Sequence, residues 1–198
     1  MKKTNIFGAA AATLVASAFM VACGPTLSEQ IPGSYLYEDS VEEPETEKEF
    51  AMKRTISETD TFGEDKSYSE EGTITRLYYI NDSESGENFT ITMSFNYRRT
   101  GTWKVEYENG EDWLVITGKE ATWELGEYIC PNSEMADFAW DLATESLEDY
   151  RTNDEKDWTS EHNYTISSVD ENEFVYETKS ETVHLKRIKD NQDTAEKE

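Results

Sequence analysis

The clearest pattern along the chain is the strict alternation of apolar and polar residues over positions 89–97, Phe-Thr-Ile-Thr-Met-Ser-Phe-Asn-Tyr. A period of two places every second side chain on the same face of a sheet, whereas a helix would spread these apolar residues around its circumference. The segment therefore predicts a β-strand with one buried face and one face in water.

Residues 102–117 predict a hairpin closed by Asn109-Gly110, because this dipeptide readily adopts the positive φ angles of a type I′ turn. With that turn, Trp103 pairs with Ile116 and Val105 with Leu114, so the apolar side chains meet on one face, and Glu108 faces Glu111. Similar but weaker patterns predict strands over 31–37, 50–56, 73–80, 121–125, 163–168, 173–178 and 182–188. Gly118 is expected to turn the chain, and the acidic residues 38–49 are expected to form an exposed loop.

The period changes after Cys130. Apolar residues then recur at steps of three and four, which predicts an amphipathic helix over residues 133–150, capped by Asn132 or Ser133. Its apolar stripe is Met135, Phe138, Ala139, Leu142, Ala143, Leu147 and Tyr150. We expect this stripe to cover the sheet or the end of a barrel, and residues 151–160 to form a polar link.

About ten strand candidates joined mostly by short turns, with one inserted helix, predict a mainly β fold. An antiparallel up-and-down meander closing into a barrel of eight to ten strands is favoured, because closure removes exposed sheet edges. The domain would span residues 31–188, followed by a charged tail over 189–198. The side chains expected to line the interior, and to contact any ligand held there, are Phe89, Ile91, Met93, Phe95, Tyr97, Trp103, Val105, Leu114 and Ile116.

The N-terminus has the order of a secretory signal: Lys2 and Lys3 precede an apolar segment over residues 6–22. An uncleaved anchor is the alternative, although 17 residues rich in Ala and Gly make a poor permanent span. Residues 20–24, Met-Val-Ala-Cys-Gly, resemble the lipobox of bacterial lipoproteins. The resemblance implies removal of residues 1–22, lipidation of Cys23, a tether over residues 23–30, and a place in the bacterial cell envelope. By analogy with lipoprotein sorting, Gly24 favours the outer membrane.

A second resemblance concerns the domain. Gly33-Ser34-Tyr35, the acidic segment after it, Gly101-Thr102-Trp103-Lys104-Val105 and Leu185-Lys186-Arg187 are similar to segments of bacterial lipocalin-like lipoproteins, a calycin-type group. The resemblance implies a lipocalin-like barrel. The strand count and the aromatic residues Phe95, Tyr97 and Trp103 on its expected inner face favour a non-catalytic barrel that binds a small apolar ligand, with the predicted helix as a lid or plug. The alternative is that the interior aromatic residues simply fill a small barrel.

The chain is strongly acidic, with 43 Asp and Glu against 18 Lys and Arg and a net charge of −25. Loss of residues 1–22 would remove two lysines and no acid, and would make the net charge −27. Such a field repels nucleic acid and favours a basic protein partner. A tethered acidic binding or inhibitory module and a structural envelope lipoprotein are therefore the alternatives to a ligand carrier.

The sequence contains no recognisable catalytic or cofactor motif. His162 and His184 are not spaced as paired metal ligands on one element. With Cys23 lipidated, Cys130 is a single thiol, which we expect to be buried. A Cys130 nucleophile with one of the histidines as its base is the remaining enzymatic alternative. We expect a protein that is not an enzyme and uses neither a cofactor nor a metal.

Overall fold

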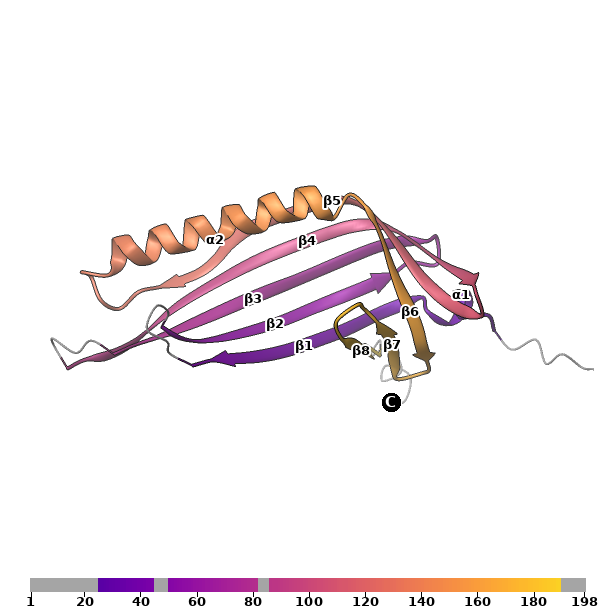
Figure 1. Ribbon diagram of the computed structural model, residues 1–198, viewed down its shortest axis with the longest axis horizontal. Coiled ribbons are helices and arrows are strands. Elements are labelled where there is room, and N and C mark those ends of the chain that lie inside the picture. The colour runs from indigo at the N-terminus through magenta and orange to yellow at the C-terminus, as the bar shows by residue number, and fades with distance from the viewer. Residues whose placement is uncertain (1–24, 45–49, 82–85, 190–198) are drawn as a thin grey trace, which may run out of the picture.

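The structure is a computed structural model that describes residues 25–44, 50–81 and 86–189. Eight antiparallel strands form a closed barrel in which each strand pairs with the next and β8 returns to β1 (Figure 1). This confirms the predicted mainly β, up-and-down, lipocalin-like barrel with one long inserted helix. The elements are α1 (Leu27–Gln30), β1 (Gly33–Glu43), β2 (Ala51–Phe62), β3 (Ser67–Asn81), β4 (Asn88–Glu108), β5 (Glu111–Ile129), α2 (Ala136–Asp157), β6 (Glu161–Val169), β7 (Glu173–Glu177) and β8 (Thr182–Arg187).

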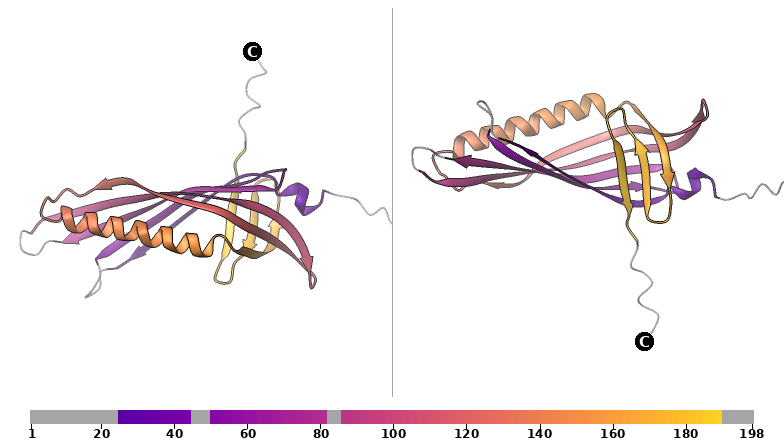
Figure 2. Two further views of the ribbon diagram at one scale, coloured as in Figure 1. Left: turned by 90° about the horizontal axis from the view of Figure 1, so that it is seen from above. Right: turned by 60° about the horizontal axis from the view of Figure 1, so that its bottom comes forward.

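The strands differ greatly in length, which divides the molecule into two halves. The short strands β6, β7 and β8 close the barrel at one end only, because β6 pairs with residues 113–117 of β5 and β8 with Tyr35 and Leu36 of β1. We call this end the closed half. Beyond it, β1 to β5 continue as a curved sheet with α2 alongside (Figures 1 and 2). We call this part the extended half.

The barrel has eight strands because predicted neighbours merge. The strand expected over 89–97 and the first arm of the hairpin are one continuous strand, β4, and the second arm continues through residues 121–125 as β5. The prediction that Gly118 turns the chain is wrong. Gly118 pairs with Gly101 inside the sheet, and a Cβ there would lie 1.9 Å from the carbonyl oxygen of Trp158. The missing side chain allows this close approach.

The predicted hairpin register is confirmed. Trp103 pairs with Ile116, Val105 with Leu114, and the turn residues Asn109 and Gly110 have φ angles of 56° and 94°. Two positive φ angles in succession are what a type I′ turn requires.

The acidic segment after the first strand was predicted as a loop, and residues 38–43 show that this is wrong. They belong to β1, where Glu42 faces Lys53 across the strand pair and Val41 faces Arg54. Lys53 Nζ lies 3.2 Å from Glu42 Oε1. Basic residues on β2 thus offset part of the acidity of β1. Residues 45–49 lie outside the described residues.

The folded domain begins earlier than predicted. Thr26 and Glu29 form a capping box at the start of α1, and Lys66 Nζ donates to Ser28 from the β2–β3 turn. Residues 26–30 of the predicted tether therefore belong to the folded domain, and a tether before them stays a prediction. The predicted leader over residues 1–22, the lipidation residue Cys23 and residues 190–198 of the predicted tail lie outside the described residues.

The predicted helix is confirmed with different bounds. Asn132 Oδ1 accepts the backbone N–H groups of Glu134 and Met135, which organises the turn before α2. The helix then continues to Asp157, so most of the predicted polar link is helical, and Trp158 at its end is buried in the closed half. Among the described residues, no helix is long and apolar enough to span a membrane.

Candidate functional site

All nine predicted interior residues lie on the inner wall of the barrel, but they do not surround one space. Trp103, Leu114 and Ile116, with Val105 beside them, belong to the cluster that fills the closed half. The alternating residues of β4 belong to a second cluster, in the extended half beneath α2, and these are Phe89, Ile91, Met93, Phe95 and Tyr97. Whether they bind a ligand stays a prediction.

Side chains fill the interior of the closed half. Tyr35, Phe62 and Phe174 meet through edge and tilted ring contacts, with centroids 5.6–5.8 Å apart, and Trp103 packs edge-on against Phe62. All four residues are at most 2% exposed. A void large enough for water would expose part of their surface, so the aromatic residues themselves occupy this space.

In the extended half, α2 covers the inner wall. Its small residues Ala139, Ala143 and Ser146 are buried against the sheet. The Tyr150 ring stacks on Trp123 of β5, with centroids 4.5 Å apart and an interplanar angle of 7°. The helix therefore occupies the place where additional strands would otherwise complete the barrel wall.

A buried polar network lies between the two apolar clusters, and Arg99 of β4 is its centre. Arg99 donates to both carboxylate oxygens of Asp154 on α2, at 2.8 and 2.9 Å, and to Glu70 of β3 at 2.7 Å. Trp123 Nε1 also donates to Asp154. Paired guanidinium–carboxylate hydrogen bonds are strong and directional, so this contact fixes the last turns of α2 on the sheet.

Two further carboxyl groups face this network from β2. Tyr68 donates to Asp60 and lies 3.1 Å from Glu70, while Tyr97 reaches across β3 and donates to Glu58. The ring of Tyr97 passes over Gly72, where a Cβ would lie 2.6 Å from the phenol. Glycine at position 72 therefore permits the contact between β4 and β2.

Burial raises the pKa values of these carboxyl groups. It raises the pKa of Glu58 to about 7, with the charge of Glu70 adding to the effect and the Tyr97 hydrogen bond opposing it. Burial, followed by the charges of Glu70 and Glu58, raises the pKa of Asp60 well above its usual range. The pKa of Glu70 is also raised by burial, although Arg99 opposes the shift.

The network carries more acid than base. Burial alone would lower the pKa of Arg99, but Glu70 and Asp154 raise it above its usual value, so this guanidinium keeps its charge. It faces four carboxyl groups, and Asp60, 2% exposed, has one oxygen without a hydrogen-bond partner. Retained protons lower the cost of this excess of buried acid. Within the described ranges, no group of three His, Cys, Asp or Glu side chains is placed to hold a metal ion.

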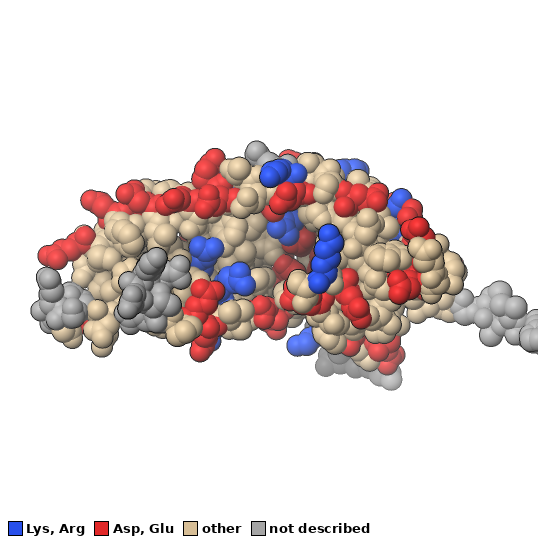
Figure 3. Space-filling model, viewed as in Figure 1, with Lys and Arg blue, Asp and Glu red and all other residues tan. Residues whose placement is uncertain are grey.

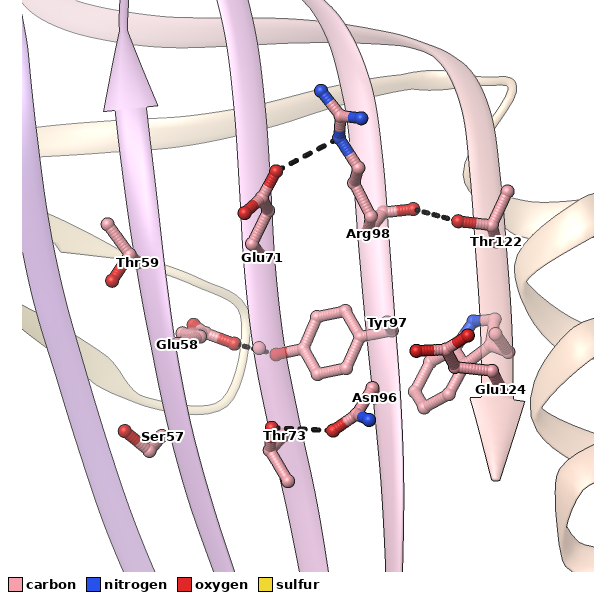
Figure 4. A pocket seen from close by; sticks show the side chains of 12 residues that line it. Ser57, Glu58, Thr59, Glu71, Thr73, Asn96, Tyr97, Arg98, Thr122 and Glu124 are labelled. Carbon is pink, nitrogen blue, oxygen red and sulfur yellow. Dashed lines mark hydrogen bonds and ion pairs between the residues drawn. The ribbon is translucent and has the colours of Figure 1, made fainter. Parts of the chain in front are cut away.

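A hollow of about 690 Å³ lies on the opposite, outer face of the sheet (Figure 4). Its floor is the row of paired residues Glu58, Gly72, Tyr97 and Trp123, whose side chains belong to the inner face. The rows on either side point outward and are entirely polar, namely Ser57, Thr59, Glu71, Thr73, Asn96, Arg98, Thr122 and Glu124. Arg98 pairs with Glu71 at 3.0 Å, and Thr73 donates to Asn96. The outward-pointing rows of this hollow therefore offer polar groups, and its aromatic residues Tyr97 and Trp123 belong to the floor.

The three residues considered for enzymatic chemistry, Cys130, His162 and His184, each contact different parts of the protein. His162 stacks on Trp158, and His184 lies 3.0 Å from Glu173 on the surface. Cys130 is half-buried rather than fully buried, and its thiol contacts the carbonyl oxygen of Asn132. The thiol and the two histidines thus have separate partners among the described residues, and the geometry gives no support to a Cys–His pair.

The exposed face of α2 carries a stripe of acids. It consists of Asp137, Asp141, Glu145, Glu148 and Asp149, which all lie on the side opposite the buried alanines. Figure 3 shows a row of acidic side chains along the upper edge of the molecule, over α2. We call these five residues the acidic stripe. Like charges four residues apart destabilise a helix slightly, so repulsion along the stripe is a small cost to α2.

Neither a search against protein-family models nor a search of curated proteins gave a match for this chain.

Proposed function

We propose that this protein is an exported lipoprotein, anchored through lipid on Cys23, whose barrel is a non-catalytic module that binds a basic protein partner through the acidic stripe of α2. The leader and its lipobox resemblance support the anchor. The filled interior of the closed half supports binding on the outside of the molecule, since the aromatic residues leave no space there for a ligand.

The acidic stripe is the observation that carries this proposal. Five exposed acids share one face of α2, and their mutual repulsion is a small cost to the free protein. A basic partner would remove that repulsion and gain long-range attraction from the net charge of −27 that remains after residues 1–22 are removed. Association should then weaken steeply as salt is added, because salt screens exposed charges.

The experiment compares charge reversals at two places on the lipidated protein. Asp141→Lys with Glu145→Lys changes the acidic stripe, and Glu120→Lys with Glu124→Lys makes the same change in charge on exposed residues of β5. We expect cross-linking to envelope proteins to fall several-fold only for the first pair, and to fall for the parent protein at high salt. Equal losses for both pairs, or capture that does not depend on salt, would refute the proposal.

A small apolar ligand beneath α2 is the second candidate. It is favoured by the apolar inner wall of β4, where Ile91, Met93 and Phe95 form a buried apolar surface beneath one helix. Co-purification of a lipid that is lost when Phe95 is changed to Asn, with the acidic stripe intact, would favour this function over the first.

A further inference from the structure

We propose that the end of the closed half built around α1 is the membrane-facing surface of the protein, and that the surface of a lipid bilayer is its partner. This inference rests on the lipid anchor of the proposed function. It adds which end of the molecule meets the membrane and which end is held away from it.

The chain between the anchor and the barrel is very short. Only Gly24 and Pro25 separate Cys23 from Thr26, which caps α1. Three residue steps span at most ~10 Å, and proline further restricts the conformations available. A lipidated Cys23 would therefore keep α1 next to the headgroups.

Several contacts join α1 firmly to the barrel. Lys66 Nζ donates to the carbonyl oxygen of Ser28 at 2.9 Å and to its hydroxyl at 2.7 Å. Arg187 of β8 donates to the carbonyl oxygens of Gln30 at 2.6 Å and Pro32 at 2.9 Å. Ile31, directly after α1, is fully buried in the closed half. From Thr26 onward the chain is held against the barrel. If α1 lies close to the headgroups, the whole of this end of the barrel therefore lies close to them as well.

The other elements at this end are the β2–β3 turn and the β4–β5 hairpin (Figures 1 and 2). The hairpin carries Tyr107, which at 73% is the most exposed large hydrophobic residue among those described. Tyrosine suits the boundary between headgroups and water, because its ring is apolar and its hydroxyl is polar. Exposed acids lie at the same end, including Glu108 and Glu111 beside the hairpin turn and Glu64 in the β2–β3 turn. This end should therefore approach zwitterionic lipid closely and be repelled by anionic lipid at low salt.

The opposite end lies much farther from the anchor than the tether can reach. β4 has 21 residues, so at ~3.3 Å per residue its path is roughly 70 Å long. The start of α2 lies at that far end (Figure 1). The acidic stripe begins there and is thus presented to the aqueous phase.

The test measures the distance of single fluorophores from the bilayer, using the full lipidated protein in vesicles of phosphatidylcholine with nitroxide-labelled headgroups. Cys130 is first replaced by Ser, and a single labelling cysteine is then introduced as Glu108→Cys in the hairpin or as Glu134→Cys before α2, both at exposed positions. We expect quenching several-fold stronger at position 108 than at position 134. Adding anionic lipid at low salt should reduce the quenching at position 108.

A matched variant removes the short tether. A flexible Gly/Ser insert of about 20 residues after Gly24 has a root-mean-square span of ~25 Å, which should abolish most of the difference between the two positions. Protein that does not float with the vesicles would refute the anchor itself. Protein that floats but shows equal quenching at both positions, or stronger quenching at position 134, would refute the orientation and leave the anchor standing.

Discussion

The closed and extended halves bury the same sheet in different ways. In the closed half, three short strands return to β1, and aromatic rings such as Tyr35, Phe62 and Trp103 interlock. In the extended half, one helix replaces the returning strands and is attached by polar contacts, with Arg99 bound to Asp154 and Arg76 bound to Tyr150. The comparison shows that one barrel wall can be completed by strands at one end and by a helix at the other.

This difference should appear in the energetics. Close-packed aromatic residues resist change because any void forfeits many contacts at once. A helix attached by a few charge-assisted hydrogen bonds depends on a small number of groups instead. We therefore expect substitutions in the closed half to unfold the whole protein and substitutions at Arg99 to release α2 before the barrel.

The largest effect is expected for Trp103→Ala. The side chain is 2% exposed, and its indole N–H donates to the carbonyl oxygen of Gly63. Its loss should lower the free energy of unfolding by about 3–5 kcal/mol, because a large cavity and an unpaired carbonyl remain. Denaturant unfolding measures the change.

The matched control is Trp140→Ala on α2, where the same side chain is about half exposed. That substitution should change stability by about 0.5 kcal/mol or less. Similar losses for the two variants would contradict the view that the closed half holds the packed core.

Arg99→Met tests the attachment of α2. Removal of the guanidinium leaves Glu70 and Asp154 buried without their cation, which should cost about 3 kcal/mol. Amide exchange should accelerate in the last turns of α2 more than in β1 or β8. Hydrogen-exchange mass spectrometry resolves these segments.

The neighbouring Arg98→Met is the control, since Arg98 points outward and pairs with Glu71 in an exposed ion pair. It should leave exchange in α2 unchanged, because exposed pairs contribute little. If exchange in α2 stayed slow in the Arg99 variant, the helix would be held by its apolar contacts and not by the network.

Much of the fold could be predicted because local patterns and the sheet agree. The alternation over 89–97 and the Asn109-Gly110 turn fix the inner face and the register of the β4–β5 hairpin, and both are confirmed. The lengths of the strands were not predictable in the same way. Arg99 and Gly101 occupy inward positions where the alternation calls for apolar side chains, so they interrupt the apparent pattern of β4, although the backbone pairing with β3 continues through them.

The polar network was missed because its members look like surface residues in a linear sequence. Glu58, Asp60, Glu70 and Arg99 are charged, yet each occupies the inward position of its strand. The available signal was the spacing of these residues from inward neighbours: Glu58 and Asp60 lie an even number of positions from Phe62 and so share its face of β2. This signal could be recognised only with the register of β2 and β3 in hand. The apolar positions of these two strands did not define that register.

The smallest of the three expected effects on stability concerns Glu58. Its titration should make the stability of the extended half depend on pH. Burial raises its pKa from 4.5 to about 7, and Glu70, Arg99 and Glu181 also act on it. The folded protein therefore binds its proton more tightly than the unfolded chain, so the free energy of unfolding falls as pH rises from about 4.5 through 7. One pKa unit is worth about 1.4 kcal/mol, and partial exposure of Glu58 reduces the expected loss to about 2 kcal/mol.

Glu58→Gln removes this titration and keeps an acceptor for Tyr97. Because glutamine stays neutral, the variant should match the parent near pH 5 and exceed its stability at pH 8, and urea unfolding at several pH values measures this difference. Glu71→Gln on the outer face, whose side chain is 63% exposed, should follow the parent at every pH. If Glu58→Gln also followed the parent, the buried network would not couple protons to folding, and the two halves would not differ in how their stability depends on pH.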